Sequence, residues 1–228
     1  MLMSRKQRLI VSYLTMRRTI GVLGIALPLV VVLGGFIENP QMLQGSISGY
    51  YYTNMRDFFV GILCVVALFL ISYQGYERID NIVSNLAGFS ALGMIIFPTK
   101  MSYHKLEKVG IFLMEDDISG FIHLFFATIF FFSLSYNSIF LFTKRHSVII
   151  SKEKRRRNIL YRASGIIMLI QILLIILYMV FLRKTYLSKA YPILIFESIA
   201  LFAFGISWLV KGNTFFRDQV KNIDEIET

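Results

Sequence analysis

The sequence predicts an all-α fold, in which six transmembrane helices form one bundle with both chain termini on the cytoplasmic side. Of the 228 residues, 56% are hydrophobic and 17% are charged, whereas a soluble domain usually carries about a quarter charged residues. The charged residues are clustered, and the six apolar segments between them are near the length of about 20 residues that spans a bilayer. Lys and Arg concentrate in alternate loops, as they do in cytoplasmic loops.

The predicted helices belong to a single membrane domain, residues 1–228, because no polar stretch is long enough for a second folded unit. The first helix follows a basic leader, residues 1–18, whose apolar spacing allows a short amphipathic helix at the membrane interface. Its apolar run is of full length and no A-x-A site follows, so we expect an uncleaved anchor rather than a signal peptide. The helices cover roughly residues 19–37, 58–76, 82–97, 120–142, 159–182 and 192–210.

The later helices each have a recognisable boundary. The second and third are joined by a tight turn, Tyr76–Asn81, and the fourth follows acidic residues that suit the positive end of a helix dipole. The sixth ends at Trp208 and Lys211, which are typical interface anchors, and the tail 212–228 is expected to lie at the membrane surface. The third helix is short and rich in small residues, which favour close packing between helices, so we expect it to be the most enclosed of the six.

The loops predict the orientation. With the N-terminus inside, 17 Lys and Arg residues lie on the inner side and 7 on the outer side, as the positive-inside rule requires. The net charge of +10 is therefore explained by cytoplasmic loops, and no nucleic-acid partner is expected. The basic run Lys152–Arg157 is a topology determinant that could also attract anionic lipid.

Polar and ionisable side chains collect at the predicted outer ends of three helices. His123 lies about 5–6 Å and Glu197 about 7–8 Å below the outer edge, at 1.5 Å of rise per residue, and Asp57 begins the second helix at that edge. Ionisable groups within the bilayer are costly and usually face the bundle interior with a partner. We therefore predict a polar pocket that opens outward and binds a lipid headgroup or another small polar ligand. Its candidate ligand-binding residues are Ser46, Ser48, Tyr51, Arg56, Asp57, His123 and Glu197.

Three other functions stay open for this cluster. An intramembrane hydrolase or transferase would use His123 as a base, with Glu197, Asp57 and Ser48 as further catalytic candidates. A structural or accessory subunit would use the same groups only to hold helices together, and a small transporter would pass its substrate between them. A hydroxyl near His123 in a wet pocket would favour the enzyme.

No metal site and no cofactor are predicted. A zinc site normally needs three or four His, Cys or carboxylate ligands. The chain has three His, and His104 and His146 fall in loops on opposite predicted sides of the membrane. Cys64 is the single cysteine and lies inside an apolar run, where it has no partner.

Several strings of the sequence carry a resemblance: SISGYYYTNMRDFFVG (46–61), YERIDN with NLAGFSALGMIIFP (76–98), GFIHLFFA (120–127), RRRNILYRASGIIML (155–169) and FESIALFAFGISWLVKG (196–212). Together they resemble a family of small six-helix bacterial membrane proteins of unknown function. The resemblance supports the six predicted helices and implies a multi-pass protein of the bacterial cytoplasmic (inner) membrane, and it transfers no catalytic residue. Membrane lipids are the partners that we expect.

A weaker likeness is to the DRAM/Frag/Sfk group of six-helix membrane proteins. Ile47-Ser48, Asn85 with Gly88, and His123 with Ala127 match that group in order. The group is tied to lipid and membrane homeostasis, so the likeness implies a lipid-associated function.

Overall fold

The computed structural model describes residues 5–38, 43–101, 107–144, 151–182 and 190–216, and the prediction of an all-α fold is confirmed for this part of the chain. A 3₁₀ turn, η1 (Ser48–Tyr52), precedes the second helix, and single π-helical turns, η2 (Asn137–Leu141) and η3 (Tyr178–Leu182), extend the fourth and fifth. The α-helices are α1 (Arg5–Glu38), α2 (Arg56–Ser72), α3 (Arg78–Ile96), α4 (Asp116–Tyr136), α5 (Lys152–Leu177) and α6 (Pro192–Lys211).

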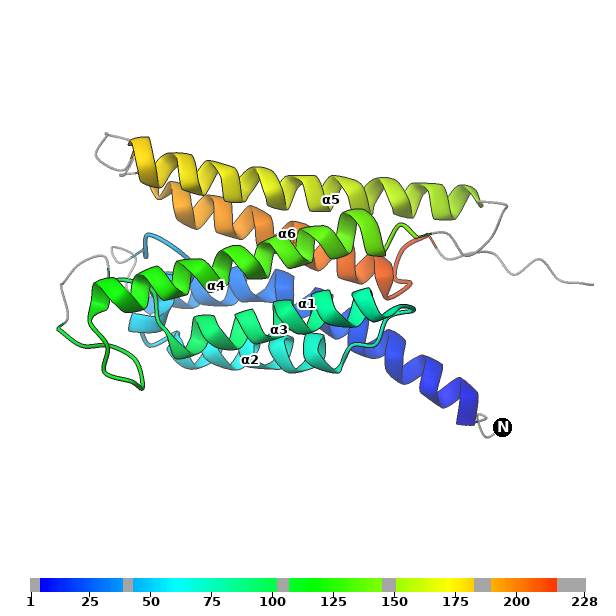
Figure 1. Cartoon of the computed structure of the whole chain (residues 1–228), viewed down its shortest axis with the longest axis horizontal. Helices are drawn as coiled ribbons and strands as arrows, with labels where there is room; N and C mark the ends of the chain where they lie inside the picture. The colour runs from blue at the N-terminus through cyan, green and yellow to red at the C-terminus, as the bar shows by residue number, and fades with distance from the viewer. Residues whose placement is uncertain (1–4, 39–42, 102–106, 145–150, 183–189, 217–228) are drawn as a thin grey trace, which may run out of the picture.

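The helices run lengthwise beside one another, with α1 oblique to the rest (Figure 1), and their contacts form a closed ring. Each helix packs against the next in the sequence, and α6 closes onto α1. The beginning of α1 extends beyond the bundle (Figure 1). Large side chains fill the core, including the fully buried Tyr50, Phe130, Phe204 and Trp208.

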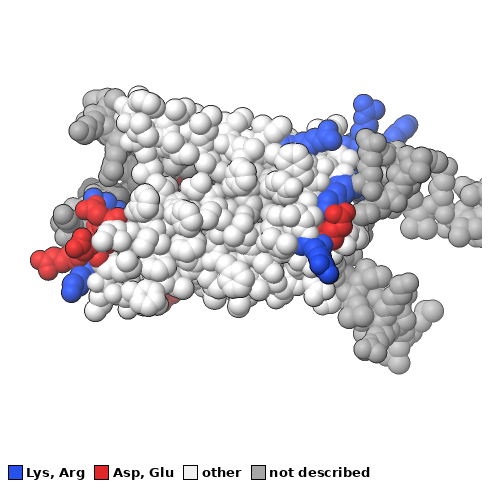
Figure 2. Space-filling model, in the orientation of Figure 1, with Lys and Arg blue, Asp and Glu red and all other residues white. Residues whose placement is uncertain are grey.

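Five helical segments are long and apolar enough to cross a membrane, which is compatible with a multi-pass membrane protein. They are Ser12–Ile37, Arg78–Ile96, Asp116–Leu141, Lys152–Leu182 and Pro192–Lys211. α2 is also apolar, but it has only 17 residues. The surface between the ends is apolar, with exposed side chains such as Phe121, Phe132 and Leu173, whereas a soluble monomer rarely exposes a large continuous apolar surface. Charged side chains gather at the two ends (Figure 2).

The two ends of the bundle differ in the residues that they carry. The basic end contains Arg17, the α2–α3 turn, the start of α5 and Lys211; the His123 end contains η1 and the first turns of α4 and α6. Figure 1 places the basic end on the right, with the N-terminus.

The helix boundaries differ from the predicted ones where side chains cap the backbone. α2 ends at Ser72 rather than residue 76, and α3 begins at Arg78 rather than residue 82. The Asp80 carboxylate accepts the N–H groups of Tyr76 (2.8 Å) and Glu77 (3.1 Å), which satisfies free donors at the start of α3. The leader is helical from Arg5 onward and is continuous with the first predicted spanning helix in α1.

The prediction that the third helix is the most enclosed is wrong, because α6 is more buried. Half of the spanning window of α6 is buried (50%), compared with 44% for α3. α6 packs against both α1 and α5, and Gly205 lets its backbone approach α1 so closely that a Cβ there would lie 2.6 Å from the carbonyl oxygen of Gly21. Gly88 gives α3 the same kind of contact with α2, where a Cβ would lie 2.7 Å from the carbonyl oxygen of Ala67. Small residues therefore mark close helix pairs in both places, and they do not by themselves identify the most enclosed helix.

Candidate ligand site at the His123 end

His123 connects the start of α4 to the end of α3. Its side chain is 5% exposed, and Nδ1 lies 3.1 Å from the carbonyl oxygen of Met94 and 2.9 Å from that of Phe97. Carbonyls near a helix C-terminus lack partners within the helix, and α3 ends at Ile96. A further bond in the same place runs from the Ser119 hydroxyl to the carbonyl oxygen of Pro98 (2.8 Å). The first turns of α4 therefore cap α3.

These contacts fix the tautomer of His123. Both neighbours of Nδ1 are carbonyl oxygens, which only accept, so Nδ1 carries the proton and donates. The other ring nitrogen, Nε2, lies 2.9 Å from the Ser48 hydroxyl, and in the neutral ring it accepts that hydroxyl's proton. The imidazole is thus oriented from one side by backbone carbonyls and presents a base to a serine on the other.

Glu197 reaches the same loop from α6. Its Oε2 accepts the N–H of Ile47 at 2.6 Å, and its carboxylate also interacts with the N–H of Ser48. His123 and Glu197 do not bond directly to one another in these contacts. They hold consecutive residues at the start of η1, so this segment is fastened to α4 through Ser48 and to α6 through Ile47.

A cavity of about 770 Å³ lies beside this loop, between α4, η3 and α6. His123, Glu197 and Ser46 contribute polar groups to its lining, and Lys100 and Asp117, which form an ion pair, also line it. Its apolar wall comes from three helical regions: Phe121, Leu124 and Ala127 of α4, Ile175 and Met179 of α5 and η3, and Ile193 of α6.

The seven predicted ligand residues do not share this cavity. Ser46, His123 and Glu197 line the cavity. Ser48 does not line it, but its hydroxyl contacts His123, which does. Tyr51 and Arg56 line a different groove, and the side chain of Asp57 is 91% exposed, 3.6 Å from the Arg56 guanidinium. The structure therefore brings together four of the predicted residues and separates three from them.

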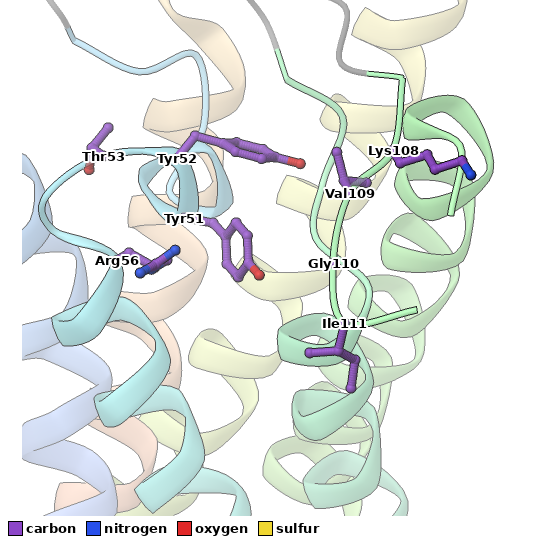
Figure 3. Close-up of a pocket in the computed structure, with 8 residues that line it drawn as sticks. All are labelled: Tyr51, Tyr52, Thr53, Arg56, Lys108, Val109, Gly110 and Ile111. Atoms are coloured by element: carbon purple, nitrogen blue, oxygen red, sulfur yellow. The ribbon is translucent and has the colours of Figure 1, made fainter. Parts of the chain in front are cut away.

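The second groove, of about 640 Å³, lies between η1 and the segment Lys108–Ile111. Figure 3 shows Tyr51 and Tyr52 extending from η1 towards this segment, with Arg56 beside Tyr51 and the Lys108 side chain directed away. The Tyr52 hydroxyl donates to the carbonyl oxygen of Thr99 (2.7 Å). Burial, together with the nearby Asp116 and Tyr51, raises the pKa of this hydroxyl, so Tyr52 stays neutral and ties η1 to the loop after α3.

Two parts of the site were not predicted from the sequence: the carbonyls of Met94 and Phe97, and the apolar wall of the cavity. The role of the two carbonyls could have been predicted from the sequence. Pro98 directly after an apolar run marks the end of a helix, and the carbonyls at a helix end need hydrogen-bond donors. No sequence feature predicted the apolar wall, since Ile175 and Met179 are indistinguishable in sequence from residues that face lipid.

Among the described residues, no group of three or more His, Cys, Asp or Glu side chains is placed to hold a metal ion. His104 and His146 lie outside the described residues. Comparisons of the chain with protein-family models, with curated proteins and with solved structures gave no match.

Proposed function

We propose that this chain is a multi-pass membrane protein that binds an amphipathic ligand, a membrane lipid, in the cavity beside His123. The observation that carries the proposal is the composition of that cavity: polar groups from His123, Glu197 and Ser46 on one part of its lining and an apolar wall from α4, α5, η3 and α6 on the other. Ligand sites are typically concave and mostly apolar, with a few polar groups that fix orientation. A headgroup suits the polar part and an acyl chain suits the wall.

The test is a titration of delipidated protein in detergent, with thermal unfolding as the measurement. Intact phospholipids of several headgroups are compared with the corresponding water-soluble glycerophosphodiesters. A ligand that binds only the folded state raises the unfolding temperature with its concentration. We expect the intact lipid to stabilise and the soluble headgroup to have little effect, because the wall contributes to binding. Equal stabilisation by the soluble headgroup would indicate a small polar ligand instead, and no response to either would contradict the proposal.

A second function, acyl transfer, is favoured by the 2.9 Å contact between Ser48 and His123. Ser48 Oγ would bond to the acyl carbon of an ester while its proton passes to Nε2 of His123, which would then return the proton to the departing alkoxide. Ser48 is nearly buried and does not line the cavity, so lipid binding is the better-supported function.

A fluorophosphonate probe separates the two functions, because it labels activated serines covalently. An acyl transferase would be labelled, and Ser48→Ala would abolish labelling while Ser46→Ala, a serine of the same loop, would not. We expect no labelling of the wild type. Labelling that disappears only in Ser48→Ala would make the enzyme the leading function.

We also infer that the basic end faces the cytoplasm of a bacterial cell. The inference rests on the excess of Lys and Arg at that end. Reporter fusions after Lys144 or Lys211 should give a cytoplasmic signal, and fusions near Lys105 or Lys184, which lie outside the described residues, should give an external one. An external signal at Lys144 would overturn the orientation.

A further inference from the structure

A second group of charged side chains lies far from the His123 cavity, at the basic end. Figure 2 shows Lys and Arg gathered there. Arg17 comes from α1, Lys154 from α5 and Lys211 from the last position of α6. Arg17 and Lys154 are each linked to Lys211 or to its neighbour Phe142. Arg17 Nη1 lies 3.4 Å from the carbonyl oxygen of Lys211, and Lys154 Nζ donates to the carbonyl oxygen of Phe142 at 3.2 Å. Lys211 Nζ lies 4.8 Å from the centre of the Phe142 ring.

Aromatic rings form the walls of this group. The Arg17 guanidinium lies 4.2 Å from the centre of the Tyr13 ring, which stacks on Tyr73 at 5.7 Å. Lys211 lies against the rings of Tyr76 and Phe142. Rings attract cations through their faces, but they supply no full negative charge.

Two carboxylates at this end pair with a different lysine, Lys144. In the described part of the chain, Glu77 and Asp80 both form ion pairs with Lys144, at 2.9 and 2.8 Å. The contacts of Lys211 Nζ within the described residues are with rings. Arg17 is 7% exposed, its hydrogen bonds to Lys211 and Tyr73 are long at 3.4 Å, and its buried Nε has no hydrogen-bond partner among the described residues.

Buried cations are normally paired, because removing an ammonium or guanidinium from water without a counter-ion is costly. Arg17 and Lys211 bring positive charge and donors to a place where rings and carbonyl oxygens are their neighbours. Lys154 lies in the first turn of α5 and Lys211 ends α6, so the group lies at one end of the bundle, where the headgroups of a surrounding bilayer would attract basic side chains. A phosphate has a negative charge and several acceptor oxygens, and Arg and Lys are its usual partners.

We propose that Arg17, Lys154 and Lys211 form a binding site for the phosphate of an anionic phospholipid at the basic end, separate from the His123 cavity. The site lies beside the run Lys152–Arg157 but depends on three helices rather than on one stretch of sequence. A bound lipid would link α1, α5 and α6 at the place where the ring closes, and would thereby stabilise the bundle.

The proposal is tested by titrating phosphatidylglycerol into the detergent-solubilised full chain and counting bound lipid by native mass spectrometry. Phosphatidylcholine is the neutral comparison, and inorganic phosphate tests whether a free anion competes. Each basic residue contributes about 1 kcal/mol to anionic lipid binding, which is about five-fold in affinity. We expect Lys211→Gln and Lys154→Gln each to weaken phosphatidylglycerol binding about five-fold and the double variant by more, with no change for phosphatidylcholine.

Arg78→Gln is the matched control, since it removes one exposed charge at the same end, outside the group. It should leave affinity within two-fold of the wild type. An equal loss in Arg78→Gln would mean that only the general surface charge attracts the lipid, and unchanged affinity in the double variant would overturn the site. Full competition by millimolar inorganic phosphate would identify a free anion rather than a lipid as the ligand. Arg17→Lys, which keeps the charge and loses the fork of donors, should weaken binding while the chain remains folded.

Discussion

Gly205→Leu should cause the largest loss of stability in the fold. A Cβ at Gly205 would lie 2.6 Å from the carbonyl oxygen of Gly21 and 3.0 Å from the backbone nitrogen of Ile25. Backbone atoms cannot turn away as a side chain can, so α1 and α6 would have to separate. Overpacking commonly costs about 1–3 kcal/mol and sometimes more, and we expect a loss at or above the upper value. Thermal unfolding in detergent, with size-exclusion chromatography to follow aggregation, measures it.

Gly61→Leu is the matched control, because a Cβ at that position of α2 has nothing within 4 Å. The same residue change should leave the unfolding temperature nearly unchanged there. Equal stability of the two variants would contradict the close approach of α1 and α6, and with it the closed ring of helices.

His123→Ala should have the second largest effect. The substitution removes the partner of the Ser48 hydroxyl and of the Met94 and Phe97 carbonyls. An unsatisfied buried group costs about 1–3 kcal/mol, so we expect a loss of at least that size in the free energy of unfolding. His123→Asn keeps a donor near the Nδ1 position and should recover part of the loss, which thermal unfolding of the three proteins would measure.

The three proteins also separate the roles of His123. If His123→Asn restores stability but lipid no longer raises the unfolding temperature, the imidazole contacts the ligand. If stability and lipid response recover together, His123 acts by holding Ser48 and the end of α3. Stability of His123→Ala equal to the wild type would show that the three contacts contribute nothing.

The helices were predictable because apolar length alone limits what can span a bilayer. The degree of burial of each helix was not predictable, since it depends on how closely the helix packs against both of its neighbours. The small residues of α3 give a close contact at Gly88, but α6 is the more enclosed helix. Helix ends shifted where single side chains act as caps, as Asp80 does for α3.

At the site, depth along the helix was the useful signal. His123 and Glu197 were expected near one loop because both lie one to two turns inside their helices, and both contact residues 47–48. Depth carries no information on the direction in which a residue points. Arg56 and Asp57 share that level yet face the surface. Whether any of the seven residues binds a ligand stays a prediction.

The most direct test of lipid binding is to fill the cavity without altering its polar groups. Ala127→Phe adds a ring to the apolar wall, and Ala163→Phe adds the same ring to an exposed face of α5 as its control. Native mass spectrometry of the purified proteins measures retained lipid per chain. We predict that Ala127→Phe loses one tightly held lipid that the wild type and Ala163→Phe keep. Equal lipid retention in all three, with all three folded, would contradict the proposal that this cavity is a lipid site.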